Sequence, residues 1–70
     1  MTSRFLFDVK NGAATYFVDG DTVFESASGR AAFFINDQTL FSYDGRPSYW
    51  IDGNYVYVHG SGEAAFFFSD

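Results

Sequence analysis

An internal repeat constrains this chain more than any other feature of its sequence. Two kinds of short segment alternate from residue 4 onward, and each kind recurs about every 17 residues. The first kind has Leu or Val third and Phe or Tyr fourth, whereas the second carries two aromatic residues, a strand-favouring residue and a turn. They fill residues 4–70 without remainder, which predicts one domain over residues 1–70. The first kind comprises 4–12, 21–29, 38–45 and 54–62, and the second comprises 13–20, 30–37, 46–53 and 63–70.

Composition indicates that these segments are strands. Phe, Tyr and Trp make up 23% of the residues, and they accompany Val, Ile and Thr, which also favour pleated surfaces. Gly or Pro interrupts every window that could hold apolar residues at helical spacing. The sequence therefore predicts an all-β fold.

The turns predict how the segments pair. Asp19-Gly20 and Asp52-Gly53 are typical of two-residue hairpin loops, and Asn36-Asp37 stands at the equivalent place. The return connections are predicted as three-residue loops at 10–12, 27–29 and 60–62, and as a two-residue loop at Asp44-Gly45. Because the missing residue falls in a loop, the strands on either side keep their register.

A longer period lies over the short one. Segment 13–20 resembles 46–53 more than its neighbours, and 30–37 resembles 63–70, both about 33 residues apart. The predicted fold is an eight-stranded antiparallel meander of four hairpin repeats, built as a duplicated unit of about 33 residues.

Alternation assigns each strand residue to one of two faces. One face is predicted to be the core, flanked by Ala14, Ala31, Pro47 and Ala64. The other face carries two rows of aromatic residues and is apolar too. The predicted core residues are Leu6, Tyr16, Val18, Val23, Phe33, Ile35, Leu40, Tyr49, Ile51, Val56, Phe66 and Phe68.

Three architectures accommodate two apolar faces. The sheet can roll or close into an up-and-down barrel, fold into a sandwich, or stay open and be completed by dimerisation. Each leaves an aromatic face for a partner, because large exposed apolar patches mark interaction sites. We expect homo-oligomerisation, with another protein as a further possible partner, through Phe17, Phe24, Phe34, Phe41 and Phe67.

Charge and cysteine usage exclude several functions. Nine acidic and four basic residues give a net charge of -5, which disfavours nucleic-acid binding. The chain has no cysteine, so disulfides and thiolate chemistry are excluded. The longest apolar run, 64–68, is too short for a membrane span. Asp8 interrupts the stretch that a signal peptide would need, so a cytoplasmic location is expected.

One group of residues suggests a ligand site. His59, the only histidine, is predicted to lie opposite Glu63 across a turn, with Arg46 and then Tyr43 in the same row. This row lies beside Trp50, Tyr55 and Tyr57, and polar groups next to flat aromatic faces suit a carbohydrate or a small aromatic ligand. The alternative is a cross-strand charge pair that only supports the sheet.

Candidates for catalysis and metal binding are weaker. Asp8 and Glu25 are predicted on one face about 10 Å apart, a separation compatible with a pair of glycosidase carboxylates. The connections are too short to build a cleft around them. The acids at 19–21 do not supply the six or more oxygens of a calcium site, so we predict no metal and no cofactor. The sequence predicts a small non-catalytic binding or scaffold module that self-associates, with a lectin-like ligand-binding module as the alternative.

Overall fold

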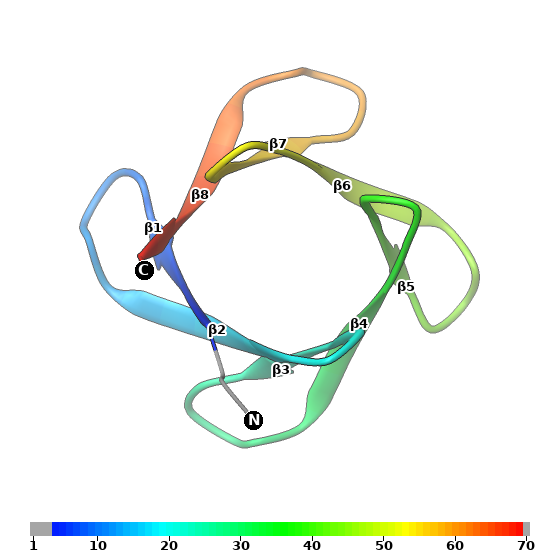
Figure 1. Cartoon of the computed structure of the whole chain (residues 1–70), viewed down its shortest axis with the longest axis horizontal. Helices are drawn as coiled ribbons and strands as arrows, with labels where there is room; N and C mark the ends of the chain where they lie inside the picture. Colours follow the sequence, from blue (N-terminus) through cyan, green and yellow to red (C-terminus); the bar gives the residue numbers. More distant parts are fainter. Residues whose placement is uncertain (1–3, 70) are drawn as a thin grey trace.

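The computed structural model describes residues 4–69, which form eight antiparallel strands and no helix. Each strand pairs with its neighbours in the chain, and β1 pairs with β8, so the sheet is a closed barrel (Figure 1). The all-β meander is confirmed, and closure removes the open sheet and the sandwich. The strands are β1 (Arg4–Asp8), β2 (Ala14–Asp19), β3 (Thr22–Glu25), β4 (Ala31–Asn36), β5 (Thr39–Ser42), β6 (Pro47–Asp52), β7 (Tyr55–Val58) and β8 (Ala64–Ser69).

Three tight turns connect β2 to β3, β4 to β5 and β6 to β7, each one residue later than predicted. Asp19 pairs with Thr22, so the first loop is Gly20-Asp21, with a positive φ at Gly20. The last tight turn, Gly53-Asn54, repeats this arrangement. A positive φ at the first position alone is typical of a type II′ turn, for which glycine is preferred. Asp-Gly and Gly-Asp both suit hairpin loops, which is why the sequence did not show which two residues form the loop.

Four longer connections, the outward loops, lie at the opposite end of the barrel and splay away from its axis (Figure 1). In each loop, a side-chain oxygen just before the glycine accepts the backbone N–H two residues later, at 2.8–3.3 Å. These local turns explain the Asn, Ser or Asp before each glycine. The acceptors are Asn11, Ser28, Asp44 and Ser61.

The outward loops are one residue longer than predicted. Asp8 N–H donates to the Ala13 carbonyl, which leaves 9–12 as a four-residue loop. The equivalent bond from Ser42 to Arg46 leaves the three residues 43–45. The one-residue difference does lie in the loop, and the strand register is unchanged across it.

Each second strand of an outward hairpin contains a β-bulge, which strict alternation did not predict. Leu6 pairs with Tyr16 but Phe7 pairs with Ala14, so Thr15 is the extra residue on β2. The bulge moves Ala14 from the predicted core face to the outer face, opposite Phe7. Ala31, Pro47 and Ala64 are displaced in the same way. The remaining bulged residues are Ala32, Ser48 and Ala65.

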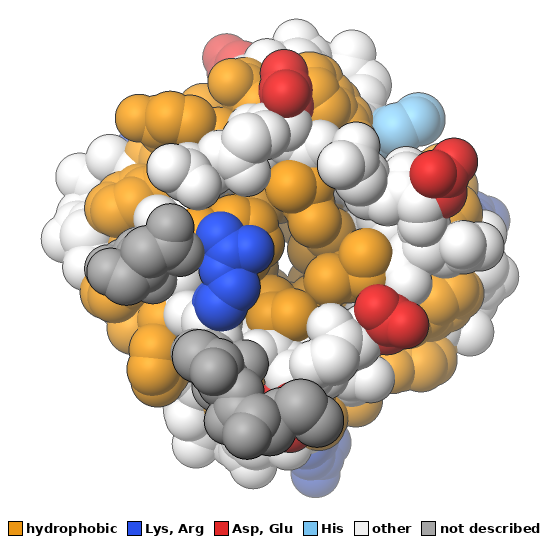
Figure 2. Space-filling model, viewed as in Figure 1, with side chains coloured by type: hydrophobic (Ala, Val, Ile, Leu, Met, Phe, Trp, Pro, Cys, Tyr) orange, Lys and Arg blue, Asp and Glu red, His pale blue; other side chains and the backbone are white. Residues whose placement is uncertain are grey.

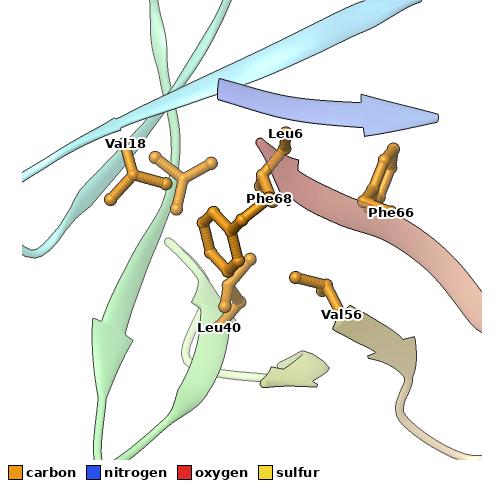
Figure 3. Packing of buried hydrophobic residues seen from close by; sticks show 7 residues of the cluster. Leu6, Val18, Leu40, Val56, Phe66 and Phe68 are labelled. Carbon is orange, nitrogen blue, oxygen red and sulfur yellow. The ribbon is translucent and has the colours of Figure 1, made fainter. Parts of the chain in front are cut away.

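The barrel lumen is filled by layers of four side chains from alternate strands, as expected for a barrel of this size. The central layer, Leu6, Val23, Leu40 and Val56, is at most 2% exposed. Towards the tight turns lie Val18, Ile35, Ile51 and Phe68. Figure 3 shows the buried members of these layers pointing into the lumen.

Towards the outward loops, the lumen holds an aromatic quartet, Tyr16, Phe33, Tyr49 and Phe66. Each ring contacts the next edge-on, with centroids 5.3–5.7 Å apart, and the four contacts close a ring. Edge-to-face pairs stabilise beyond the area they bury. Every predicted core residue thus faces the lumen. The described residues contain no helix that could cross a membrane.

Candidate functional site

The outer surface of the barrel carries four pairs of stacked aromatic rings. Each pair lies across two neighbouring strands, with ring centroids 4.4–5.6 Å apart and planes within about 22° of parallel. They arise because the fourth residue of each first-kind segment faces an aromatic residue of the adjacent strand. The pairs are Phe17–Phe24, Phe34–Phe41, Trp50–Tyr57 and Phe7–Phe67.

Two further rings join three of these pairs into one surface, the aromatic band. Phe5 lies 6.2 Å from Phe17 and 6.4 Å from Phe7. Tyr55 lies 6.5 Å from Phe67 and 6.3 Å from Tyr57. The band runs over β6, β7, β8, β1, β2 and β3. In order, it consists of Trp50, Tyr57, Tyr55, Phe67, Phe7, Phe5, Phe17 and Phe24.

The band stops short of β4 and β5 because the repeats differ at their second residue. Phe5 and Tyr55 occupy this position in two repeats, and Thr22 and Thr39 occupy it in the others. Phe5 and Tyr55 are also the most exposed members of the band, at 45% and 47%. The charged residues of β1, Arg4 and Asp8, pair with lumen residues and not with the band.

The residues predicted for self-association all lie on the outer face, but they are only half-exposed. Phe17, Phe24 and Phe67 belong to the band, whereas the pair Phe34–Phe41 lies outside it beside the exposed Tyr43. Stacking covers one face of each ring, so the surface is less exposed than the sequence suggested. Phe5 and Tyr55 are more exposed than the five predicted residues, and the Phe/Thr/Thr/Tyr difference between repeats could have drawn attention to them.

The predicted ligand residues separate into two groups. Trp50 and Tyr57 stack at 4.4 Å and Tyr55 lies beside them, whereas Arg46, His59 and Glu63 lie in or next to the outward loops. Within residues 4–69, no hydrogen bond or ion pair joins the second group to these rings.

The predicted polar row differs in register from the structure. The backbone of Glu63 bonds to Val58, not to His59, and the backbone of Arg46 bonds to Ser42, not to Tyr43. The longer loops explain this shift. Arg46 Nε lies 3.9 Å from Asp44 Oδ2, and both side chains are mostly exposed.

Asp8 and Glu25 stabilise the outward loops. Asp8 Oδ1 accepts the Lys10 N–H at 2.8 Å, and Glu25 Oε1 accepts the Ser28 hydroxyl at 2.6 Å. Both side chains belong to the row that faces the lumen beyond the aromatic quartet.

A small pocket lies at this outward-loop end of the barrel. It measures about 250 Å³, and its lining includes Asp8, Lys10, Tyr49 and Glu63. No cluster of three or more potential metal-ligating His, Asp or Glu side chains is present in the part of the chain that the structure describes.

A larger pocket, the lumen mouth, opens at the tight-turn end of the barrel. It has a volume of about 380 Å³. Figure 2 views this end and shows an opening edged by hydrophobic side chains, with a basic side chain beside it. This pocket was not predicted from the sequence, because it depends on closure of the barrel. Its lining residues are Arg4, Val18, Gly20, Asp21, Ile35, Ile51 and Phe68.

Comparisons with family models, curated proteins and solved structures found no match to this chain.

Proposed function

We propose that this protein is a non-catalytic module that associates with a second copy of itself through the aromatic band. The supporting observation is the continuity of eight outward-facing rings across six strands, with Phe5 and Tyr55 nearly half-exposed among them. Exposed aromatic residues in a continuous apolar patch are enriched at protein interfaces. Association over β7, β8 and β1 would cover the two most exposed rings, Phe5 and Tyr55.

A second copy suits this surface because of where the charges lie. The chain carries a net charge of -5, and the acidic side chains within residues 4–69 lie at the two ends of the barrel, in or beside the turns and loops. Two copies that meet side by side through the band would keep these like charges away from the centre of the interface. Depletion of charge at the centre of a contact is typical of stable interfaces.

The first prediction concerns the double variant Phe5→Thr/Tyr55→Thr. The other two repeats carry threonine at this position, so the barrel already accommodates the substitution. Sedimentation velocity across a hundredfold concentration range should show a dimer or larger species for the wild type and a monomer for the variant. The matched control is Tyr43→Thr, which removes an exposed ring outside the band and should leave the association unchanged.

Two results would contradict the proposal. One is a wild-type monomer at every concentration, and the other is dissociation by Tyr43→Thr but not by the double variant. Circular dichroism of both variants shows whether they keep the fold, so that loss of association is not confused with unfolding.

The alternative is a carbohydrate or planar ligand on Trp50, Tyr55 and Tyr57. It is less well supported, because Trp50 and Tyr57 cover one face of each other and the polar residues that would orient a sugar lie elsewhere. Trp50 is the only indole, so its fluorescence reports on this surface directly. Emission that changes and saturates with a glycan would favour the alternative over self-association.

A further inference from the structure

The turn between β4 and β5 divides the barrel into two similar halves. One half comprises β1–β4 and the other comprises β5–β8, and each corresponds to one copy of the duplicated unit. Two strand pairs join the halves, β4 with β5 and β8 with β1. Each half alone would be an open sheet with two unpaired edge strands, which expose backbone groups that can pair with another chain. Each half therefore needs a second half to close the sheet.

The turn that joins the halves is strained. Asp37 and Gln38 form it, with φ values of 56° and 65°. In the other two tight turns, Gly20 and Gly53 adopt the positive φ. Glycine takes up this conformation without steric cost, whereas a residue with Cβ does so unfavourably. The β4–β5 turn is therefore the tight turn that would release the most strain by opening.

Opening this turn lets the chain run on from β4 into β5 without reversing its direction. Asp37 and Gln38 then leave the left-handed conformation, and β5–β8 separate from β1–β4 of the same chain. A second copy opened in the same way supplies the missing half, so both strand pairs that join the halves form again between copies. Exchange of an identical element is a low-cost route to a dimer, and short strained hinge loops favour it.

We propose that two copies of this chain exchange halves at the β4–β5 turn and form a dimer of two barrels. Each barrel consists of β1–β4 from one copy and β5–β8 from the other. The aromatic band crosses from β8 to β1, so each band of the dimer combines rings from both copies. This association is separate from contact between bands, which leaves each barrel within one chain.

Packing and charge determine the conditions under which the dimer forms. Exchange breaks two strand pairs and opens the buried central layer, so it requires unfolding and occurs when the chain refolds at high concentration. The extended connection brings the tight-turn ends of the two barrels towards each other, and Asp21, Asp37 and Asp52 lie in or beside these turns. Salt at about 1 M shortens the range of charge repulsion to about 3 Å and should favour the dimer.

The test uses the full chain with Phe5→Thr and Tyr55→Thr, so that contact between bands does not contribute. Refolding from urea at millimolar protein in about 1 M salt should give a dimer on size-exclusion chromatography that persists after dilution. Refolding at micromolar protein should give a monomer. A monomer at both concentrations would overturn the exchange, and it would leave the band association of the wild type unaffected.

The stacked ring pairs report which turn has opened, because a different pair spans the strands on either side of each tight turn. Labelled and unlabelled chains are refolded together, and isotope-filtered NOE spectra detect contacts between copies. The Phe34–Phe41 contact should form between copies, as should the ring contact between β8 and β1. The matched contact Phe17–Phe24 should stay within one chain. The opposite result for these two pairs would place the hinge at another turn and refute the proposal.

Substitutions at Gln38 in the same background should change the dimer yield in opposite directions. Gln38→Gly relieves the strain of the closed turn and should lower the yield about tenfold, whereas the control Gln38→Ala keeps Cβ and should leave it unchanged. Gln38→Pro fixes φ at about −65°, which excludes the closed turn, and should give a dimer even at micromolar protein. Equal yields for Gln38→Gly and Gln38→Ala would overturn the proposal, and this comparison does not depend on whether the proline variant folds.

Discussion

At the residue scale, phenylalanine and tyrosine rings share one packing arrangement in the aromatic quartet of the lumen. Phe33 and Phe66 alternate with Tyr16 and Tyr49 around the ring, and all four make the same edge-to-face contacts. The rings alone therefore account for these contacts, and the packing does not require the tyrosine hydroxyl groups. Burial, and then the charges of Tyr49 and Glu25, raise the pKa of Tyr16 above its ordinary value of 10.0.

This raised pKa predicts that the free energy of unfolding depends on pH, and that Tyr16→Phe reduces this dependence. The folded chain holds the Tyr16 proton more tightly than the unfolded chain, so this contribution to the free energy of unfolding is fully present below pH 10.0. It is lost as the pH rises through the higher folded pKa. The wild type should lose stability above pH 10.0 more steeply than Tyr16→Phe, which keeps the ring contacts and has no proton to release.

Urea unfolding at neutral pH and at several values above pH 10.0 measures this difference. Tyr43→Phe is the control, because it removes an exposed hydroxyl from a residue that is not part of the quartet. Parallel loss of stability in the wild type and Tyr16→Phe would show that ionisation of Tyr16 is not coupled to folding.

At the element scale, one tight turn has no glycine, whereas the other two tight turns begin with one. Asp37 and Gln38 form the loop between β4 and β5, with φ values of 56° and 65°. Positive φ at both loop residues is typical of a type I′ turn, which favours Asn-Gly. Gln38 therefore occupies a left-handed conformation that costs a non-glycine residue about 1–2 kcal/mol.

Replacing Gln38 with glycine should stabilise the barrel. The relieved strain exceeds the ~0.5–1 kcal/mol that glycine adds in unfolded-chain entropy, so we expect a net gain of about 0.5–1 kcal/mol and a Tm higher by roughly 2–8 °C. Differential scanning calorimetry checks this. Gln38→Ala removes the same side chain but keeps Cβ, so it should give no such gain. Equal Tm values for the two variants would mean that backbone strain is not the cause.

The elements also show what the sequence can and cannot predict. Alternation identified the lumen face correctly at Leu6, Val23 and the other core residues, because each first-kind segment is a short regular strand. It failed at Ala14, because one extra residue, Thr15, bulges where the outward loop meets β2. Nothing in the pair Ala13-Ala14 marks that bulge, since small residues suit either face.

At the scale of the whole molecule, pairing of β8 with β1 decides between the barrel, the sandwich and the open sheet. The candidate sites were hard to predict because they depend on this pairing. Each of the four bulges bends and twists its hairpin. The sheet that contains them is curved enough for β8 to pair with β1. The strand pattern is compatible with several architectures, so the lumen mouth could not be foreseen. The exposed position of Phe5 and Tyr55 likewise depends on which strands become neighbours.

Closure has a consequence for chain connectivity. β8 and β1 pair in the same register as the strands on either side of a tight turn: Phe67 faces Phe7 as Phe17 faces Phe24. Extending that register places Ser69 opposite Phe5, as Asp19 is opposite Thr22. The barrel thus has the geometry for a fourth tight turn between β8 and β1.

We predict that the protein folds as a circular permutant in which β8 is joined to β1 by a tight turn. A chain that omits residues 1–3, joins Ser69 to Arg4 through one glycine in place of Asp70, and opens between Gly29 and Arg30 would read Ser-Gly-Arg-Phe where the first tight turn reads Asp-Gly-Asp-Thr. The new ends fall in an outward loop, where chain ends are best tolerated. Cooperative thermal unfolding and dispersed methyl NMR signals would support the design.

The matched control opens the same joined chain inside the barrel wall, between Phe33 and Phe34 in β4. This break divides a strand that pairs with both neighbours and separates a quartet ring from a stacked outer ring. It should therefore unfold or become molten under conditions in which the loop permutant is stable. If both permutants fold equally well, continuity of β4 is not required. If neither folds, pairing of β8 with β1 does not tolerate a direct connection between these strands, and closure is not the repeating geometry inferred from the other three hairpins.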